Sequence, residues 1–143
     1  MAELIYSALS NPRRPIVYVD PQLSVTHCVN LMIRQDVGAL VVHDDKRLLG
    51  MVTERDIVRS CINQHLDPDV ATAGDIAYTD VSILTVDMPV EAAMEVITKT
   101  KRRHVLIEEN GILIAVLSIG DLLFHILESK QQEIKHLENY IHT

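Results

Sequence analysis

Two hydroxyl–acid pairs are the residues of this sequence best suited to hold a polar ligand. Thr53 is followed three residues later by Asp56, and Ser118 by Asp121. Each pair stands where an apolar, strand-like run gives way to a helix-like stretch, so free helix N–H groups lie beside it. Such a position is well suited to hold a polar ligand.

Helix capping is the competing interpretation of the same residues. Threonine, serine and aspartate are all favoured at helix N-termini, where their oxygens accept backbone N–H groups. Capping explains either pair when it is taken alone. The recurrence of both residue types at equivalent places favours ligand contact over capping.

The sequence around the two pairs is duplicated. Ser118 follows Thr53, and Asp121 follows Asp56, at one constant offset of 65 residues. An apolar pattern upstream keeps the same offset without a gap. The equivalent pairs are Val25 with Val90, Val29 with Met94, Met32 with Ile97, Leu40 with Val105, and Val42 with Ile107. This agreement indicates an internal repeat.

Each half is predicted to run strand, helix, strand, strand, helix, from its apolar periodicity and turn residues. The strands are expected at 16–19, 39–42, 48–52, 81–86, 105–107 and 112–117. The first two helices are expected at 24–35 and 54–64. A third helix is expected to have Pro89 in its first turn, and a fourth is expected to begin at Asp121. The dipeptide Asn110-Gly111 is the strongest local sign of a hairpin. A polar hairpin loop is also expected at His43–Arg47, and a short helical turn at Ala71–Asp75.

Length and composition predict that the halves share a core. The chain has 143 residues, of which 48% are hydrophobic. A half of about 60 residues would bury too little surface to be comfortable alone, so the halves are expected to pack together. The expected organisation is an N-terminal segment (1–15), repeat one (16–66), a linker (67–80), repeat two (81–127) and a C-terminal helix extension (128–143).

Several kinds of partner and site are disfavoured by the composition. The net charge is −7, no basic run is present, and there is one Phe and no Trp, which argues against nucleic acid. Neither a signal peptide nor a membrane-spanning run is predicted, so a cytoplasmic protein is expected. Cys28 and Cys61 match no zinc or redox spacing. No metal site and no catalytic residue are predicted, because the histidines share no metal-binding spacing and no phosphate loop or nucleophile motif occurs.

The duplicated segments GMVTERD (50–56) and VLSIGD (116–121), together with the element order, resemble the CBS domain, named for cystathionine β-synthase. The resemblance covers roughly 16–127 as a tandem pair. It implies an α+β fold (α/β sandwich-like) in which two βαββα repeats pack by pseudo-two-fold symmetry. It also implies that adenosine-containing ligands, such as AMP, ATP, NADH or S-adenosylmethionine, bind in clefts between the repeats; no other cofactor is expected.

The resemblance also assigns roles to particular residues. It implies that Asp56 and Asp121 accept hydrogen bonds from ribose hydroxyls, and that Thr53 and Ser118 meet phosphate. The remaining expected ligand contacts are Arg55, beside the first motif, and Arg103 and His104, at the start of the second middle strand. Repeat one has Val37, Gly38 and Ala39 at the latter place, so the two pockets are expected to differ in charge. Leu106 and Ala115 depart from the family pattern, and a side chain at 115, where repeat one has Gly50, is expected to crowd a ligand.

The resulting functional prediction is a stand-alone regulatory module that senses an adenosine-containing ligand and signals to an unidentified partner protein. Two alternatives remain open. One is a nucleotide-hydrolysing enzyme that uses Asp56 or Asp121. The other is a structural dimerisation module with empty clefts. The sequence does not distinguish among the possible ligands.

The C-terminal stretch predicts a homodimer. Asp121–Tyr140 contains no Gly or Pro, and its apolar residues fall at heptad steps. These residues are Leu123, Leu127, Ile134, Leu137 and Ile141, with Lys130 at the remaining step. An amphipathic helix needs its stripe covered. A second chain is the favoured cover, and folding back onto the chain's own repeats is the alternative.

Overall fold

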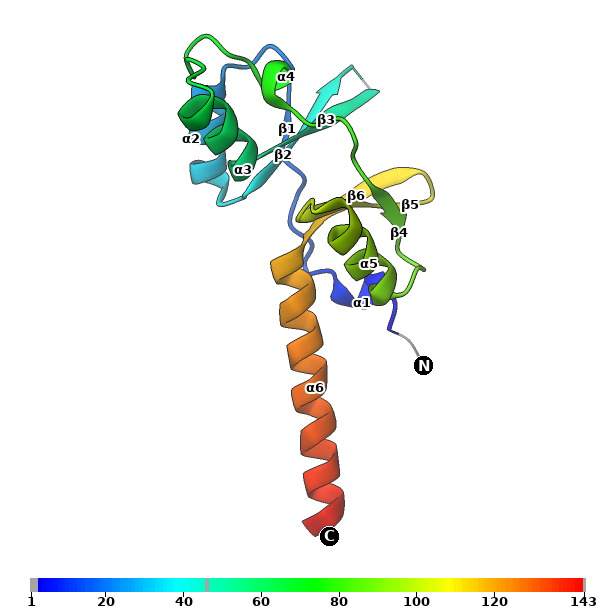
Figure 1. Cartoon of the computed structure of the whole chain (residues 1–143). Coiled ribbons are helices and arrows are strands. Elements are labelled where there is room, and N and C mark those ends of the chain that lie inside the picture. Colours follow the sequence, from blue (N-terminus) through cyan, green and yellow to red (C-terminus); the bar gives the residue numbers. More distant parts are fainter. Residues whose placement is uncertain (1–2, 46, 143) are drawn as a thin grey trace. The chain divides into compact units, whose positions relative to one another are not determined.

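The computed structural model describes residues 3–45 and 47–142, and the chain divides into two compact units. The repeat-one unit is Pro15–Val81. The repeat-two unit consists of the N-terminal segment, which ends at Arg14, together with the residues from Ser82 onward. Each unit holds one three-stranded sheet with helices packed on it (Figure 1).

The repeat-one unit follows the predicted order of elements. Its elements are β1 (Tyr18–Val19), α2 (Val25–Gln35), β2 (Ala39–Asp44), β3 (Arg47–Thr53), α3 (Glu54–Ile57), the π-helical turn η1 (Val58–Asn63) and α4 (Ala73–Ile76). β2 is the central strand, parallel to β1 and antiparallel to β3. Because helix α2 covers the sheet, Leu40 and Val42 of β2 are fully buried against Cys28 and Met32.

The repeat-two unit has the same plan, with α1 packed on it and its last helix, α6, extended to His142. Its elements are α1 (Ile5–Ala8), β4 (Ile83–Thr85), α5 (Val90–Thr100), β5 (His104–Glu109), β6 (Ile112–Ser118) and α6 (Ile119–His142). β5 lies between β4, its parallel neighbour, and β6, its antiparallel neighbour. The predicted fold class, two βαββα repeats with a C-terminal helix, is confirmed.

The two units match each other residue by residue, at the offset that the sequence predicts. The sheet register shifts between Val42 and His43 in one and between Ile107 and Glu108 in the other. The helices α2 and α5 both end in a left-handed residue, Asp36 and Lys101. A shared irregularity at equivalent positions is stronger evidence of duplication than shared regular structure, since bulges are retained features of a fold.

The hairpin between β5 and β6 forms as its sequence predicts. Asn110 and Gly111 are the two loop residues, and their φ angles are 53° and 78°. Positive φ at both central residues defines the type I′ turn, whose twist fits the flanking strands. The predicted loop at His43–Arg47 is shorter than expected, with β2 reaching Asp44 and β3 starting at Arg47. Lys46 lies outside the described residues.

Two helix predictions need correction. The helix expected over 54–64 is α-helical only through Ile57, after which the chain makes the wider turn η1. Within this turn the Ser60 hydroxyl donates to the Asp56 carbonyl at 2.7 Å, a contact that competes with regular helix bonding. Pro89 is the N-cap of α5 rather than part of its first turn.

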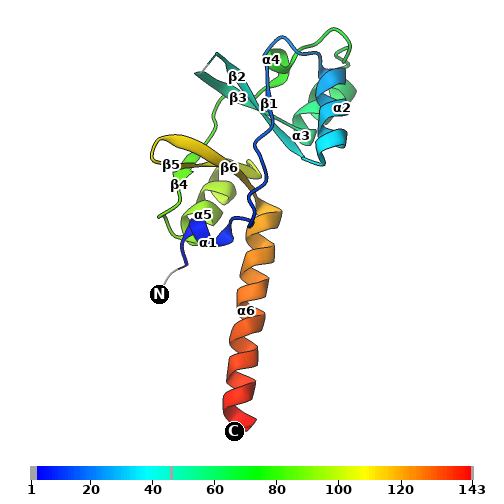
Figure 2. The same ribbon diagram turned by 180° about the vertical axis from the view of Figure 1, so that it is seen from behind.

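The N-terminal segment belongs to the repeat-two unit, although no helix was predicted there. Ile5 of α1 is fully buried among Ile97, Val105 and Leu117. Its backbone N–H donates to the Met88 carbonyl at 2.8 Å. Helices α1 and α5 therefore lie together beside the start of α6 (Figure 2).

Candidate functional site

The first hydroxyl–acid pair forms a capping box at the start of α3. Thr53 ends β3 in an extended conformation, and Asp56 Oδ2 accepts from the Thr53 N–H at 2.8 Å and from the Thr53 hydroxyl at 2.7 Å. The Asp56 N–H donates back to the Thr53 hydroxyl at 3.4 Å. Asp56 is only 9% exposed. Thr53 and Asp56 therefore cap the N-terminus of their own helix, α3.

The second pair is tied less tightly. Asp121 Oδ2 accepts from the Ser118 N–H at 3.0 Å, and the Asp121 N–H donates to the Ser118 hydroxyl at 3.1 Å. Among the described residues the other carboxylate oxygen, Oδ1, accepts no hydrogen bond. Asp121 is also exposed, in contrast to Asp56. Its carboxylate is therefore oriented by one oxygen and available at the other.

Arg103 and His104 lie next to this second pair along the backbone. The Arg103 carbonyl accepts from the Ile119 N–H at 2.8 Å, and His104 is the register partner of Ser118. In the repeat-one unit the Gly38 carbonyl accepts from Glu54 N–H at 3.2 Å in the same way. The structure thus brings four of the predicted site residues to one end of the β5–β6 pair.

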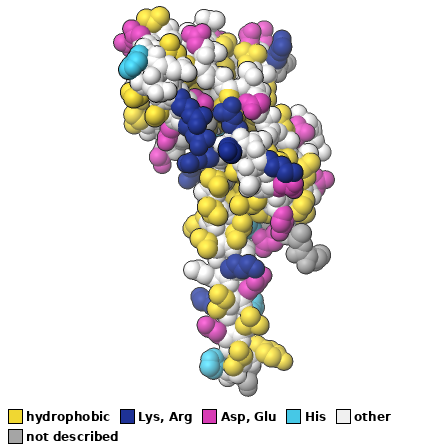
Figure 3. Space-filling view, in the orientation of Figure 1, with side chains coloured by type: hydrophobic (Ala, Val, Ile, Leu, Met, Phe, Trp, Pro, Cys, Tyr) yellow, Lys and Arg dark blue, Asp and Glu magenta, His cyan; other side chains and the backbone are white. Residues whose placement is uncertain are grey.

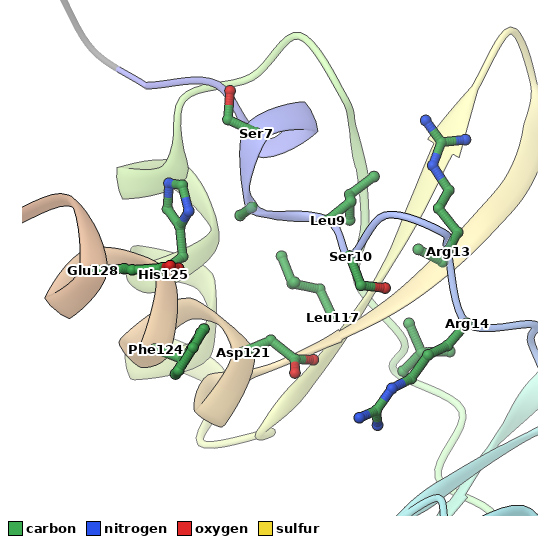
Figure 4. Close-up of a pocket in the computed structure, with 13 residues that line it drawn as sticks. Ser7, Leu9, Ser10, Arg13, Arg14, Leu117, Asp121, Phe124, His125 and Glu128 are labelled. Carbon is green, nitrogen blue, oxygen red and sulfur yellow. The ribbon is translucent and has the colours of Figure 1, made fainter.

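A pocket of about 420 Å³ lies against Asp121 in the repeat-two unit (Figure 4). Its wall comes from the N-terminal segment, from β6 and from the first turns of α6. The lining residues are Ser7, Ala8, Leu9, Ser10, Arg13, Arg14, Ala115, Val116, Leu117, Asp121, Phe124, His125 and Glu128. Its volume is within the range of about 300–1,000 Å³ that small-molecule sites occupy.

The charges of this pocket are divided between its two sides. Asp121 and Glu128 come from α6, and Arg13 and Arg14 come from the N-terminal segment on the other side (Figure 4). Asp121 directs its carboxylate away from α6, toward the side on which Arg14 lies (Figure 4). One side thus offers hydrogen-bond acceptors and the other offers fixed cations.

The N-terminal wall of the pocket is held against α6 by a small polar cluster. The Glu3 carboxylate pairs with His125, and the Ser129 hydroxyl donates to it at 3.1 Å. The hydrogen bond from His125 is the main reason why the pKa of Glu3 lies below its ordinary value, with Ser129 acting in the same direction. Further along the segment, the Arg13 guanidinium sits over the Tyr6 ring at 5.4 Å.

The equivalent edge of the repeat-one unit is closed by its own chain. Met51 of β3 and Tyr78 exchange two backbone hydrogen bonds of 3.0 Å. A Cβ at Gly50 would lie 2.3 Å from the Tyr78 carbonyl oxygen, so only glycine fits there. In the repeat-two unit the matching residue is Ala115, which lines the pocket. The glycine of repeat one is therefore explained by close chain packing, whereas the expected crowding of a ligand by Ala115 stays a prediction.

A second hollow, of about 540 Å³, lies between α2 and α3 of the repeat-one unit. Its lining is apolar except for two acids, Asp36 and Glu54, and no described lining residue is basic. An anionic ligand would meet only like charge there. The repeat-two pocket is therefore the better candidate for a phosphate-bearing molecule.

Of the predicted site residues, Asp121 alone is among the described residues that line the repeat-two pocket. Thr53, Arg55 and Asp56 belong to the other unit. Arg13 and Arg14 were missed because the first fifteen residues were interpreted only as a lead-in to the first strand. The signal that points to them is a pair of adjacent arginines directly before that strand.

Features that would support catalysis are few in the part of the chain that the structure describes. No group of three or more His, Cys, Asp or Glu side chains there could hold a metal ion. Burial raises the pKa of the Cys28 thiol, which keeps it protonated and unreactive. Across the same residues no helix is long and apolar enough to cross a membrane.

Comparison with known proteins decides the family. The family model for the CBS domain matches residues 7–63 and again residues 73–128. The chain belongs to the CBS domain family. Both matches reach back to the helices that precede β1 and β4, in agreement with the helices α1 and α4 of the structure.

Two curated relatives are about 30% identical to this chain over the aligned residues. The CBS domain-containing protein CBSX3, mitochondrial, of Arabidopsis thaliana is 31% identical over 123 residues, which cover 82% of this chain and 60% of that protein. Hypoxic response protein 1 of Mycobacterium tuberculosis is 30% identical over 106 residues, covering 73% of this chain and 74% of that protein. The chain thus spans less than two thirds of the first of these relatives.

Solved structures of CBS-domain proteins share the fold. The CBS-domain containing protein ATU1752 from Agrobacterium tumefaciens superposes with a TM-score of 0.77 at 30% identity, covering 84% of this chain and 96% of that one. CBSX2 in complex with AMP superposes with a TM-score of 0.70, covering 90% of this chain and 98% of that one. At 22% identity the latter is similar in fold alone.

Proposed function

We propose that this chain is a CBS-domain regulatory module that senses an adenosine-containing nucleotide, and that the repeat-two pocket is a site for that ligand. The observation that carries the proposal is the division of charge within one cavity. Asp121 and Glu128 stand on the α6 side, and Arg13 and Arg14 stand on the N-terminal side. A nucleotide has the complementary layout, because its ribose hydroxyls donate and its phosphate is an anion.

Asp121 is assigned to the ribose. Its Oδ2 is held by the Ser118 N–H, which fixes the carboxylate and leaves Oδ1 available to a ligand in the pocket that Asp121 lines. An ionised carboxylate is an acceptor only, so it matches a diol, which donates twice. A hydrogen bond to such a charged group contributes about 1.5–3 kcal/mol.

The arginines are assigned to the phosphate, and the β6 side chains to the base. Arg14 reaches the mouth of the pocket from the N-terminal segment, and a guanidinium binds phosphate oxygens in a bidentate manner. Ala115 and Leu117 supply an apolar wall for the purine. Ser118, Arg103 and His104, close along the backbone, remain predicted contacts to the phosphate.

The AMP bound to CBSX2 supports the choice of ligand class, since that protein shares this fold. The proposal extends to a second ligand contact through Thr53, Arg55 and Asp56. In that motif the Thr53 hydroxyl already donates to Asp56, so its first role is to cap α3. Which of AMP, ATP, NADH or S-adenosylmethionine binds is the question for the experiment.

The output of the module is assigned to a partner protein rather than to catalysis by this chain. Hydrolysis of a nucleotide needs a metal cluster or a base beside the phosphate. The pocket offers arginines beside the expected phosphate position and places Asp121 on the opposite side. A change in the pocket can reach other molecules through α6, because Asp121 and Phe124 belong to that helix.

Isothermal titration with each of the four nucleotides tests the proposal. Asp121→Asn keeps an acceptor for the Ser118 N–H but replaces the free oxygen with an amide, and should weaken binding about 10- to 100-fold. Asp75→Asn is the matched control, because Asp75 makes the same capping contact to Thr72 N–H at 2.9 Å in the repeat-one unit. Equal binding by wild type and both variants would exclude Asp121 as a ligand contact.

A second measurement separates sensing from hydrolysis. Purified protein incubated with ATP should return it unchanged, as followed by ion-exchange chromatography. Product that forms with wild type and is lost in Asp121→Asn would favour the enzyme alternative. Failure of every nucleotide to bind would favour the structural module with empty clefts.

A further inference from the structure

The outer part of α6 carries an apolar stripe that its own repeat-two unit leaves uncovered. Every residue from 130 to 142 is exposed. Leu137 is 63% exposed and Tyr140 is 82% exposed. In Figure 3 hydrophobic side chains appear along the projecting helix, separated by charged ones. The repeat-two unit, to which the tail belongs, therefore does not cover this stripe.

The stripe has the spacing of a helix-pairing seam. Its members are Leu123, Leu127, Ile134, Leu137 and Ile141, with Phe124 and Tyr140 beside its two ends. These residues fall at alternating steps of four and three, which place them on one face of a helix. Lys130 occupies the one step that is not apolar. Any partner of this face must therefore accommodate a cation in the middle of an apolar seam.

Glu133 supplies the counter-charge for that cation. Lys130 Nζ lies 3.5 Å from Glu133 Oε2, and both side chains are about two-thirds exposed. In a parallel pair of α6 helices, Lys130 would face Lys130 of the second copy in the same layer, and Glu133 would approach Glu138 across the flank. Both contacts are repulsive. A parallel pair is therefore disfavoured by the charges on this face.

The antiparallel arrangement removes this conflict. When Leu127 lies opposite Leu137 of a second copy, Leu123 comes opposite Ile141, and Lys130 comes opposite Ile134. Each Lys130 then has two carboxylates within reach, its own Glu133 and Glu133 of the second copy. The centre of the seam then holds two anions with one cation on each side of them, flanked in turn by apolar layers. The same surface thus complements itself only when it is reversed.

We propose that a second copy of this chain covers the stripe, through an antiparallel pairing of the two α6 helices centred on the Lys130–Glu133 cluster. The paired segments run from Leu123 to Ile141, about 27 Å of helix at 1.5 Å per residue. An isolated pairing of this length is marginal in water, so the body of each repeat-two unit stabilises the first turns by holding Leu122 in its core. This pairing does not depend on the proposed nucleotide site.

A charge reversal tests the centre of the seam. Lys130→Glu places four carboxylates at the cluster, and should raise the dissociation constant of the dimer about tenfold. The double variant Lys130→Glu/Glu133→Lys restores two cations beside two anions, and should return the constant to within about threefold of wild type. A parallel pair also gains from the double variant, because the contact between positions 133 and 138 becomes attractive, so the direction of the pairing is decided by cross-linking. Sedimentation velocity of the full chain over a micromolar range measures each constant.

Cross-linking tests the direction. Leu127→Cys and Leu137→Cys are made separately, mixed, and treated with a short bifunctional thiol reagent. The antiparallel pair joins 127 to 137, so the mixed product should exceed either product formed from one variant alone. Wild type controls for cross-links through Cys28 or Cys61. The substituted positions are exposed, so far-UV circular dichroism should be unchanged.

Three results would overturn the proposal. A wild-type chain that is monomeric at micromolar concentration would assign the stripe to a different protein. Preferential 127–127 and 137–137 products would assign it to a parallel pair. A dimer that is unaffected by Lys130→Glu and by Leu137→Asp would assign self-association to another surface.

Discussion

Replacing Asp56 with alanine should destabilise the chain more than replacing Asp121, although the two residues are equivalent in sequence. Asp56 is 9% exposed, and its Oδ2 accepts two hydrogen bonds of 2.8 and 2.7 Å. Removing it leaves the Thr53 N–H without its acceptor. Bonds to a charged group contribute about 1.5–3 kcal/mol, and the two share one donor residue, so we expect a loss of about 3 kcal/mol.

Replacing Asp121 with alanine should lower the free energy of unfolding by a smaller amount. Asp121 is exposed, and its Oδ2 accepts one bond, of 3.0 Å. Loss of an exposed capping contact costs about 1 kcal/mol. Urea unfolding followed by circular dichroism measures both values, and Asp75→Ala should behave like Asp121→Ala because it removes a similar exposed cap. Equal losses at Asp56 and Asp121 would refute the argument that burial separates the two motifs.

Two further predictions concern the equivalent residues Gly50 and Ala115 and the contact between Glu3 and His125. Gly50→Ala should destabilise the repeat-one unit by about 1–3 kcal/mol, because its Cβ would meet the Tyr78 carbonyl oxygen, whereas Ala115→Gly should lower the thermal midpoint only slightly. Stability from Glu3 should be present above pH 4.5, and should be lost as the pH falls through its lowered pKa. Glu3→Gln should thus weaken the protein at pH 6 in urea unfolding, and its effect should shrink as the pH is lowered below 4.5, whereas an effect that does not change with pH would contradict the pairing with His125.

The repeat and its register could be predicted because duplication appears directly in the sequence. Thr53 and Ser118, at one offset, predicted two helix starts, and Asn110-Gly111 predicted the hairpin that the structure contains. These signals are local, since a turn or a cap depends on a few neighbouring residues. The family resemblance rests on the same segments, and the family match confirms it.

The candidate pocket could be predicted only in part. Asp121 was anticipated, but Arg13 and Arg14 reach the pocket because α1 packs on the repeat that is distant in sequence. The difference between Gly50 and Ala115 likewise depends on where the chain after α4 runs. Such contacts join residues far apart in the chain, and no short motif announces them. The difference in burial between Asp56 and Asp121 likewise depends on residues that are far apart in the chain.

The most direct test of the nucleotide site compares AMP with adenosine by isothermal titration on wild type, Arg13→Ala and Arg14→Ala. Arg34, on α2 of the repeat-one unit, provides the matched control as Arg34→Ala. Wild type should bind AMP at least about tenfold more tightly than adenosine, because charge-assisted contacts to phosphate contribute about 1.5–3 kcal/mol. Arg14→Ala should reduce this ratio and leave the affinity for adenosine unchanged. A ratio that is the same in all four proteins, or no binding of either ligand, would contradict the assignment of this pocket to an adenosine nucleotide.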